Sequence, residues 1–222
     1  MQSVILSTSN GNAERRLACP DCPAFGVCAP TELLPGPTNA CAFESLRIDA
    51  RTPLPDRWHG DATLALVRRG IVVRQRVDAR GRVATVDAAG IGSVIPIDEG
   101  GARIWAVTDA VLCLLPRDAG DGWDVTKLVR AVLDRVERIA EARGRSSSVS
   151  RAAALLCVLA DTLTPTPRAL VPADLPQRMM ASLAGLRQES ICRAFKRLLR
   201  RNLVMRDDRG LHLLDREALE AM

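Results

Sequence analysis

The alternation of apolar and polar positions divides the chain into a strand-rich half and a helix-rich half. Between residues 46 and 115, short apolar runs such as 63–67 and 71–77 are separated by turns that contain Gly and Asp. Runs of this length, bounded by such turns, are typical of antiparallel strands. This half of the chain therefore predicts a small antiparallel β-roll or barrel.

A long amphipathic helix is predicted next, over residues 121–145. Its apolar residues recur at helical spacing, and charged residues such as Arg130 and Asp134 occupy the other side, four positions apart. The valine-rich stripe favours a seam between two subunits. Packing on the chain's own β-roll explains the same pattern, and both arrangements can hold together. The predicted interface residues are Val125, Leu128, Val129, Val132, Val136 and Ile139.

The segment 146–150 is rich in serine and separates this helix from a second set of helices. An apolar helix is expected over 152–163, followed by a short helix that starts near Pro176 and ends at Gly185. A second helix is expected over 187–201, and two short strands follow it. Helix, glycine-containing turn and helix form the helix-turn-helix pattern, and the hairpin adds a wing.

Basic residues are concentrated in this second helix. The window 187–201 holds six of them against one acid, Glu189, so it carries the formal charge of +5 found for the whole chain. Such a stripe indicates either a phosphate-binding surface or a solvated helix face. Within a helix-turn-helix, Arg193 can pair with guanine and Glu189 with cytosine, although the two could instead form an intrahelical ion pair. The residues expected to contact the DNA backbone are Arg187, Gln188, Lys196, Arg197 and Arg200.

Three thiols near the N-terminus have the spacing C-x2-C-x5-C: Cys19, Cys22 and Cys28. Thiolates hold both iron–sulfur clusters and zinc, so either metal is possible, and loop thiols without a metal are the plain alternative. The chain has no apolar run long enough to span a membrane, and residues 1–16 lack the apolar segment of a secretory signal. A cytoplasmic location is therefore expected, where thiols stay reduced.

These motifs resemble, in order and spacing, the CRP/FNR family of bacterial transcription regulators, in particular its FNR-like branch. The resemblance rests on the segments 19–28, 69–70, 111–116 and 185–193, together with the long helix. It implies an α+β fold with a β-roll like that of cyclic-nucleotide-binding domains. The predicted organisation is a flexible N-terminus (1–18), a cysteine loop with the β-roll (19–120), a dimerisation helix (121–145) and a winged helix-turn-helix (146–222).

The resemblance also implies a cofactor and partners. The cofactor is a 4Fe-4S cluster, lost in oxygen or nitric oxide, and its loss weakens DNA binding. The local sequence around Cys113 by itself predicts a buried core residue, and Cys41 competes with it as the fourth ligand. The implied partners are a second copy of the chain, an inverted-repeat operator in double-stranded DNA, and RNA polymerase. The implied cluster ligands are Cys19, Cys22, Cys28 and Cys113.

The sequence departs from the family pattern at a few positions. Cys192 stands where Ser is usual among the base-reading residues, and Arg187 replaces the usual Thr or Ser cap of the recognition helix. Arg103 is followed by Ile104 rather than by Ser or Thr, so cyclic AMP is not expected as the ligand.

Two other functions compete with cluster sensing. The first is a regulator that uses its thiols for zinc or for direct oxidation. The second is an enzyme or electron carrier, which is disfavoured because the only histidines are His59 and His212 and no nucleophile–base pair is evident.

Overall fold

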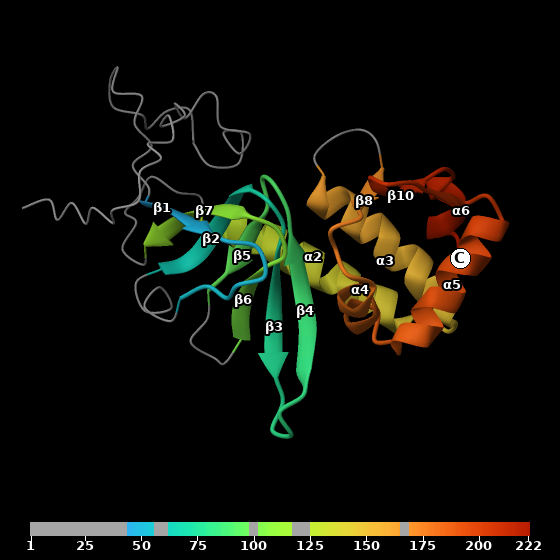
Figure 1. Cartoon of the computed structure of the whole chain (residues 1–222), viewed down its shortest axis with the longest axis horizontal. Helices are drawn as coiled ribbons and strands as arrows, with labels where there is room; N and C mark the ends of the chain where they lie inside the picture. Colours follow the sequence, from blue (N-terminus) through green and yellow to red (C-terminus); the bar gives the residue numbers. More distant parts are fainter. Residues whose placement is uncertain (1–43, 56–61, 98–101, 117–124, 165–168) are drawn as a thin grey trace, which may run out of the picture.

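The computed structural model describes residues 44–55, 62–97, 102–116, 125–164 and 169–222. Figure 1 shows a β-rich half and a helix-rich half, with the long helix α2 (Val125–Gly144) reaching from one to the other. The predicted α+β class and the order of its parts are confirmed.

The β-rich half is a roll of two antiparallel sheets. One sheet has the strand order β1-β7-β2-β5, and the other has the order β4-β3-β6. Both sheets contribute buried residues such as Val67, Leu112, Val72 and Ile104 to one core. The strands are β1 (Glu44–Ile48), β2 (Ala62–Arg69), β3 (Val72–Val77), β4 (Val83–Ala89), β5 (Val94–Pro96), β6 (Ala102–Ala106) and β7 (Ala110–Pro116).

Helix α2 is attached to the roll by an apolar contact and by a buried ion pair. Leu128 and Val132 pack with Cys113 of β7 in one buried cluster. One turn further along, Arg135 donates from Nε and Nη2 to the two carboxylate oxygens of Asp87 in β4, each at 2.8 Å. These contacts set the rotation of α2 about its own axis, because they bury one side of it.

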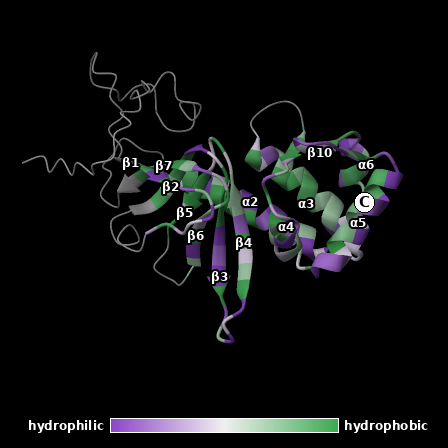
Figure 2. Cartoon of the chain, in the orientation of Figure 1, coloured by the Kyte–Doolittle hydropathy of each residue, from purple (hydrophilic) through white to green (hydrophobic). Residues whose placement is uncertain are grey.

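Helix α3 (Ser148–Leu163) is the centre of the helix-rich half and is buried along most of its length. Figure 2 shows it as largely hydrophobic, whereas the outer helix α5 carries hydrophilic patches. The Ser147 side chain caps α3 by accepting from the Ser150 amide at 3.0 Å. The other elements are β8 (Leu170–Pro172), α4 (Gln177–Leu183), α5 (Gln188–Arg200), β9 (Val204–Arg206), β10 (Gly210–Leu213) and α6 (Arg216–Glu220).

The two halves share a core. Ile71, Val73 and Ala88 of the roll belong to the same buried cluster as α3 and the helix-turn-helix. At the end of β4, a Cβ added to Gly90 would lie 2.5 Å from the Leu163 carbonyl oxygen. Only glycine allows β4 and the end of α3 to approach so closely.

Two details differ from the predicted elements. The apolar residues between 102 and 116 form two strands, β6 and β7, rather than one. The turn between them includes Thr108, whose hydroxyl accepts from the Ile71 amide at 3.0 Å. The predicted wing hairpin is a three-stranded sheet of order β8-β10-β9. No helix in the described ranges is both long enough and apolar enough to cross a membrane.

Candidate nucleic-acid interface

Helices α4 and α5 form the predicted helix-turn-helix. Gly185 in the turn has a φ of +63°, a backbone conformation that favours glycine. The turn residue Arg187 is the N-cap of α5 and makes no side-chain capping hydrogen bond. Its side chain is exposed, so this departure from the usual cap leaves a cation at the start of the helix.

Helix α5 has one buried side and one charged side. Ile191, Phe195 and Leu198 are almost fully buried against α3 and α4. The predicted backbone-contacting residues Arg187, Gln188, Lys196, Arg197 and Arg200 are all exposed. This division follows from the helical period, because the apolar positions recur every three or four residues.

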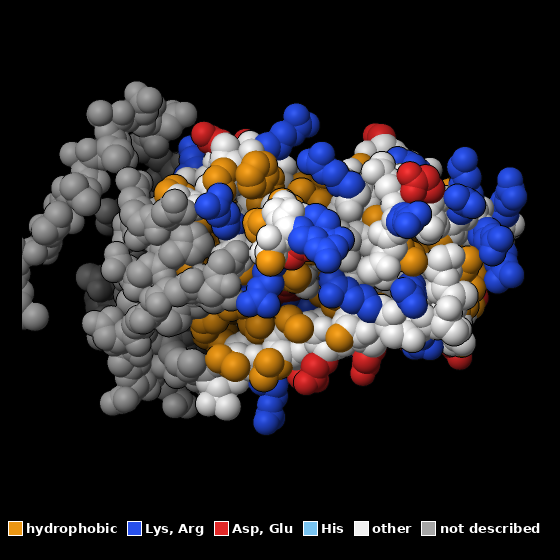
Figure 3. Space-filling model, turned by 90° about the horizontal axis from the view of Figure 1, so that it is seen from below, with side chains coloured by type: hydrophobic (Ala, Val, Ile, Leu, Met, Phe, Trp, Pro, Cys, Tyr) orange, Lys and Arg blue, Asp and Glu red, His pale blue; other side chains and the backbone are white. Residues whose placement is uncertain are grey.

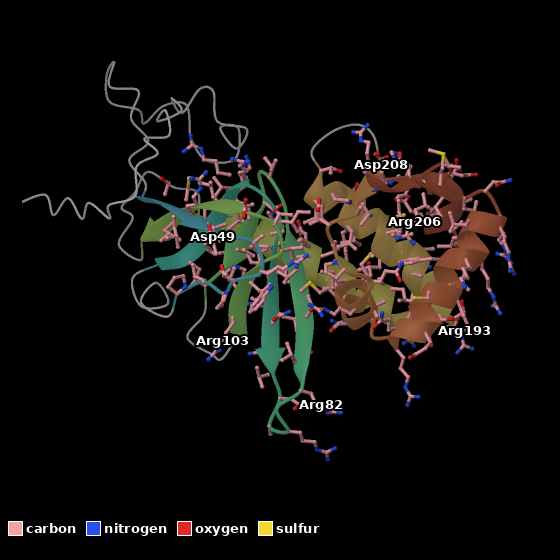
Figure 4. All side chains as sticks on the ribbon, in the orientation of Figure 1. Asp49, Arg82, Arg103, Arg193, Arg206 and Asp208 are labelled. Carbon is pink, nitrogen blue, oxygen red and sulfur yellow. The ribbon has the colours of Figure 1, made fainter. Side chains whose placement is uncertain are left out.

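Glu189 and Arg193 lie at the N-terminal half of α5 and are both exposed. In the described part of the chain they form no ion pair with each other, so the intrahelical alternative is not what this structure adopts. Figure 4 shows Arg193 pointing outward from α5. Both side chains are therefore available to a ligand.

Cys192 differs from its two neighbours because it is held by another helix. Its thiol donates to Oε1 of Gln177, the first residue of α4, with Sγ and Oε1 3.0 Å apart. The half-buried thiol is therefore directed toward α4. Gln177 was not among the predicted site residues. The only feature of the sequence that could have indicated it is its position at the start of the predicted helix.

Seen from below, the molecule presents many Lys and Arg side chains and few Asp and Glu side chains (Figure 3). Helix α5 carries part of this charge, since its polar face holds four cations and a single acid. An exposed basic face of this kind attracts phosphate groups.

A comparison with protein families identifies the domain that carries this helix. Residues 150–222 match the model of the Crp-like helix-turn-helix domain. This match covers α3 to α6, which we call the Crp-like domain. No curated protein matched the sequence in a separate comparison.

Solved structures with a similar fold cover most of the chain. FixK2 from Bradyrhizobium japonicum aligns with a TM-score of 0.67 and 19% identity, over 82% of this chain and 97% of its own. A CRP-family transcriptional regulator from Thermus thermophilus aligns at 0.60 and 22% identity, over 79% and 95%. A CooA mutant from Carboxydothermus hydrogenoformans aligns at 0.61 and 17% identity, over 81% and 87%. The β-roll, the long helix and the Crp-like domain together thus have the fold of these proteins.

The structure separates the predicted dimer residues into two stripes on α2. Leu128, Val132 and Ile139 are 4%, 8% and 2% exposed within their own chain. They pack on the roll or on the helical core of their own chain, so little of their surface is left for a partner, and their place in a dimer interface stays a prediction. The side chain of Val125 lies outside the described residues.

A second stripe on α2 faces outward. Val129 and Leu133 are 40% and 53% exposed. Ala140 is exposed as well, and the half-buried Val136, which also packs against the Leu128 and Val132 cluster, lies at the edge of the stripe, so these residues are spaced by four, three and four positions. Such spacing suits the seam of a two-helix coiled coil. Leu133 and Ala140 were not among the predicted interface residues, because sequence alone does not distinguish two adjacent stripes.

Cys113 is the one predicted cluster ligand within the described ranges. It is 1% exposed in β7 and belongs to the same cluster as Leu128 and Val132 of α2. Cys19, Cys22, Cys28 and the competitor Cys41 lie outside the described residues. No group of three possible metal ligands occurs among the residues that the structure describes.

A polar contact links the roll to the Crp-like domain. The Thr85 amide in β4 donates to Oγ of Ser182 in α4 at 2.8 Å. Arg143, near the end of α2, donates from Nε to the Leu183 carbonyl at 2.7 Å and from Nη2 to the Thr85 carbonyl at 3.2 Å. Partial burial lowers the pKa of Arg143 from its ordinary value. This domain contact joins the roll, α2 and the helix-turn-helix at one point.

Proposed function

We infer that the protein is a dimeric transcription regulator of the CRP/FNR type that binds duplex DNA through α5. The observation that carries this proposal is the exposed face of α5, where Glu189 and Arg193 form no ion pair with any residue that the structure describes and lie next to a row of cations. The face belongs to a domain that matches the Crp-like helix-turn-helix. That match supports a regulator over an enzyme or an electron carrier.

The groups on α5 suit two kinds of DNA contact. Arg193 can donate two hydrogen bonds to guanine O6 and N7, and Glu189 can accept from cytosine N4. Lys196, Arg197 and Arg200 lie further along the helix and suit phosphate groups, which fix the position of the protein without reading sequence. The Cys192 thiol is occupied by Gln177, so we assign it a smaller part in base reading than its two neighbours.

Sequence-selective binding is the direct test. The protein would be used to select duplexes from a random library, and the Kd of a selected and a scrambled duplex would be measured by fluorescence anisotropy. Arg193→Ala should weaken binding of the selected duplex by about 1–3 kcal/mol in each half-site, as expected for loss of one bidentate base contact from each chain of the dimer. Lys196→Ala should weaken both duplexes alike and lower the salt slope of the dimer by about two, one contact in each chain.

The matched control for these variants is Arg69→Gln, which removes an exposed cation at the end of β2. It should leave both Kd values unchanged. Equal affinity of the wild-type protein for selected and scrambled duplexes would exclude this function.

A homodimer through the outward stripe of α2 completes this function. An inverted-repeat operator needs two recognition helices held at a fixed separation. The exposed Val129 and Leu133, with Val136 and Ala140, give each chain a seam for the equivalent helix of a second copy. The opposite stripe is already buried in its own chain, so a partner helix would not have to displace the roll.

The proposed signal is the state of a 4Fe-4S cluster held by Cys19, Cys22, Cys28 and Cys113. A bound cluster would supply a centre that oxygen or nitric oxide degrades. Support comes from the thiol ligand type and from the position of Cys113 against Leu128 and Val132. A displacement of Cys113 would act on α2 directly, because the thiol and the helix share one small buried cluster.

Anaerobic purification tests the cluster. About four iron and four sulfide per chain are expected, and Cys113→Ser should lose them. Cys157→Ser is the matched control, because Cys157 is also buried, at 3% exposure, but lies in α3. Bound zinc, or iron-free protein whose DNA binding responds to thiol oxidation, would favour the alternative regulator. Loss of iron in Cys41→Ser but not in Cys113→Ser would show that Cys41, and not Cys113, is the fourth cluster ligand.

A further inference from the structure

The β3–β4 hairpin extends away from the roll as a two-stranded ribbon with a basic tip. Its strands pair from Val72 and Ala89 to Val77 and Val83. In the described ranges β6 pairs with β3 only as far as Arg76, and every residue from 76 to 84 is exposed. Three arginines lie in this exposed part, against one acid, Asp78. The arginines are Arg76, Arg80 and Arg82.

The tip is an ordered turn. The carboxylate of Asp78 accepts from the amides of Arg80 and Arg82 at 2.9 and 3.0 Å. It also pairs with the Arg82 guanidinium at 2.7 Å, and these contacts lower the pKa of Asp78. Arg82 nevertheless keeps 72% of its side-chain surface in solvent. Beside the turn, Val77 and Val83 face each other across the strands and are 51% and 59% exposed. Packing in the hydrophobic core therefore does not account for these two apolar side chains.

The hairpin is fixed relative to the reading helix. Thr85, near the base of the ribbon, makes the domain contact with Ser182 of α4 and with Arg143. From Thr85 the strand continues for two residues to Val83, and the turn at residues 78–82 lies beyond it. Figure 4 shows Arg82 at the end of the hairpin and Arg193 on α5 directed to the same side of the molecule. Figure 3 looks at that side and shows Lys and Arg side chains spread across it.

We propose that the β3–β4 hairpin is a second DNA-contacting element, in which Arg80 and Arg82 bind backbone phosphates that flank the half-site read by α5. This inference rests on the proposed DNA binding and extends its footprint to the roll. Charge complementarity favours phosphate as the occupant, since cations outnumber acids three to one at the tip. A two-stranded ribbon is also a shape that DNA grooves admit.

Duplex length and salt dependence test the proposal on the full-length protein. The probes are a selected operator with short flanks and the same operator extended by about one helical turn, roughly 10 bp, on each side. The wild-type protein should bind the extended duplex more tightly. The variant Arg80→Gln/Arg82→Gln should lose that gain, about tenfold at moderate salt, and the salt slope of the dimer should fall by about four, two contacts in each of its two chains.

Two further variants separate a contact from a structural role. Asp78→Asn keeps an oxygen acceptor for the turn but removes the negative charge, so it should tighten binding of the extended duplex several-fold. A hairpin that serves only stability would not produce tighter binding. Arg69→Gln removes the same charge just before β3, at the end away from the tip, and it should change neither affinity nor slope.

These experiments distinguish failure of the hairpin contact from failure of DNA recognition by α5. If the wild-type protein selects no operator, DNA recognition by α5 is wrong. If Arg193→Ala loses the operator while Arg80→Gln/Arg82→Gln binds both duplexes like the wild type, only the hairpin contact is wrong. If that double variant binds DNA normally but loses polymerase-dependent transcription in vitro, the hairpin docks an acidic protein surface, and the phosphate contact is overturned.

Discussion

The buried pair of Asp87 and Arg135 is expected to be the most sensitive polar contact between the roll and α2. Asp87 has none of its side chain exposed and Arg135 has 8%. Arg135 makes two hydrogen bonds of 2.8 Å to the carboxylate and one of 2.7 Å to the Val94 carbonyl. Arg135→Met would remove all three and leave a carboxylate buried without its cation.

The expected loss is about 3–5 kcal/mol, the usual cost of breaking one side of a buried ion pair. Total unfolding free energies are about 5–15 kcal/mol, so the variant should be much less stable. For a chain of this size the loss corresponds to a fall in Tm of about 10 °C. Urea unfolding followed by circular dichroism, together with scanning calorimetry, would measure both quantities.

A double variant makes the reasoning refutable. Asp87→Asn with Arg135→Met removes both charges and retains an acceptor for the Ala88 amide, which Asp87 binds at 2.8 Å. It should be about 2 kcal/mol more stable than Arg135→Met alone, because no isolated buried charge remains. Arg130→Met, at an exposed position of the same helix, should cost less than about 0.5 kcal/mol. A loss below about 1 kcal/mol in Arg135→Met, or strict additivity in the double variant, would refute the argument.

Three other expectations concern separate parts of the chain. Leu133→Glu puts a charge on the outward stripe of α2 and should convert the dimer to monomers in analytical ultracentrifugation, while the circular dichroism spectrum of the folded chain stays unchanged because Leu133 is exposed in its own chain; a dimer that persists would contradict the seam. Hydrogen bonding from Arg216, with a weaker contribution from Arg138, lowers the pKa of Asp161. The resulting stability is complete above the ordinary pKa of 3.8 and is lost as pH falls through the lowered value, so Asp161→Asn should flatten acid unfolding in that window. Burial raises the pKa of Cys157 to about 11, so iodoacetamide at neutral pH should spare Cys157 in the native protein, as peptide mass spectrometry would show.

Much of the fold was predictable because its signals are local. Strands and turns between residues 46 and 115 follow from apolar runs and Gly- or Asp-containing breaks, and α5 follows from the apolar period that ends in Leu198. The exposure of Glu189 and Arg193 follows from the same period. The bonds from Cys192 to Gln177 and from Thr85 to Ser182 were not predictable, because their partners are 15 and 97 residues apart.

Helix α2 shows which features of the fold the sequence determines and which depend on tertiary contacts. The sequence by itself predicted an amphipathic helix over residues 121–145, whose apolar surface is wider than a single coiled-coil seam, and the structure has this helix at Val125–Gly144. Only the tertiary structure decided which part of that surface is internal. Leu128 and Val132 against the roll, and Arg135 on Asp87, fix the rotation of α2, and this rotation turns Val129 and Leu133 outward. Periodicity gives the width of the apolar face. Which part of that face is buried and which is exposed depends on distant residues that the helix contacts only in the folded chain.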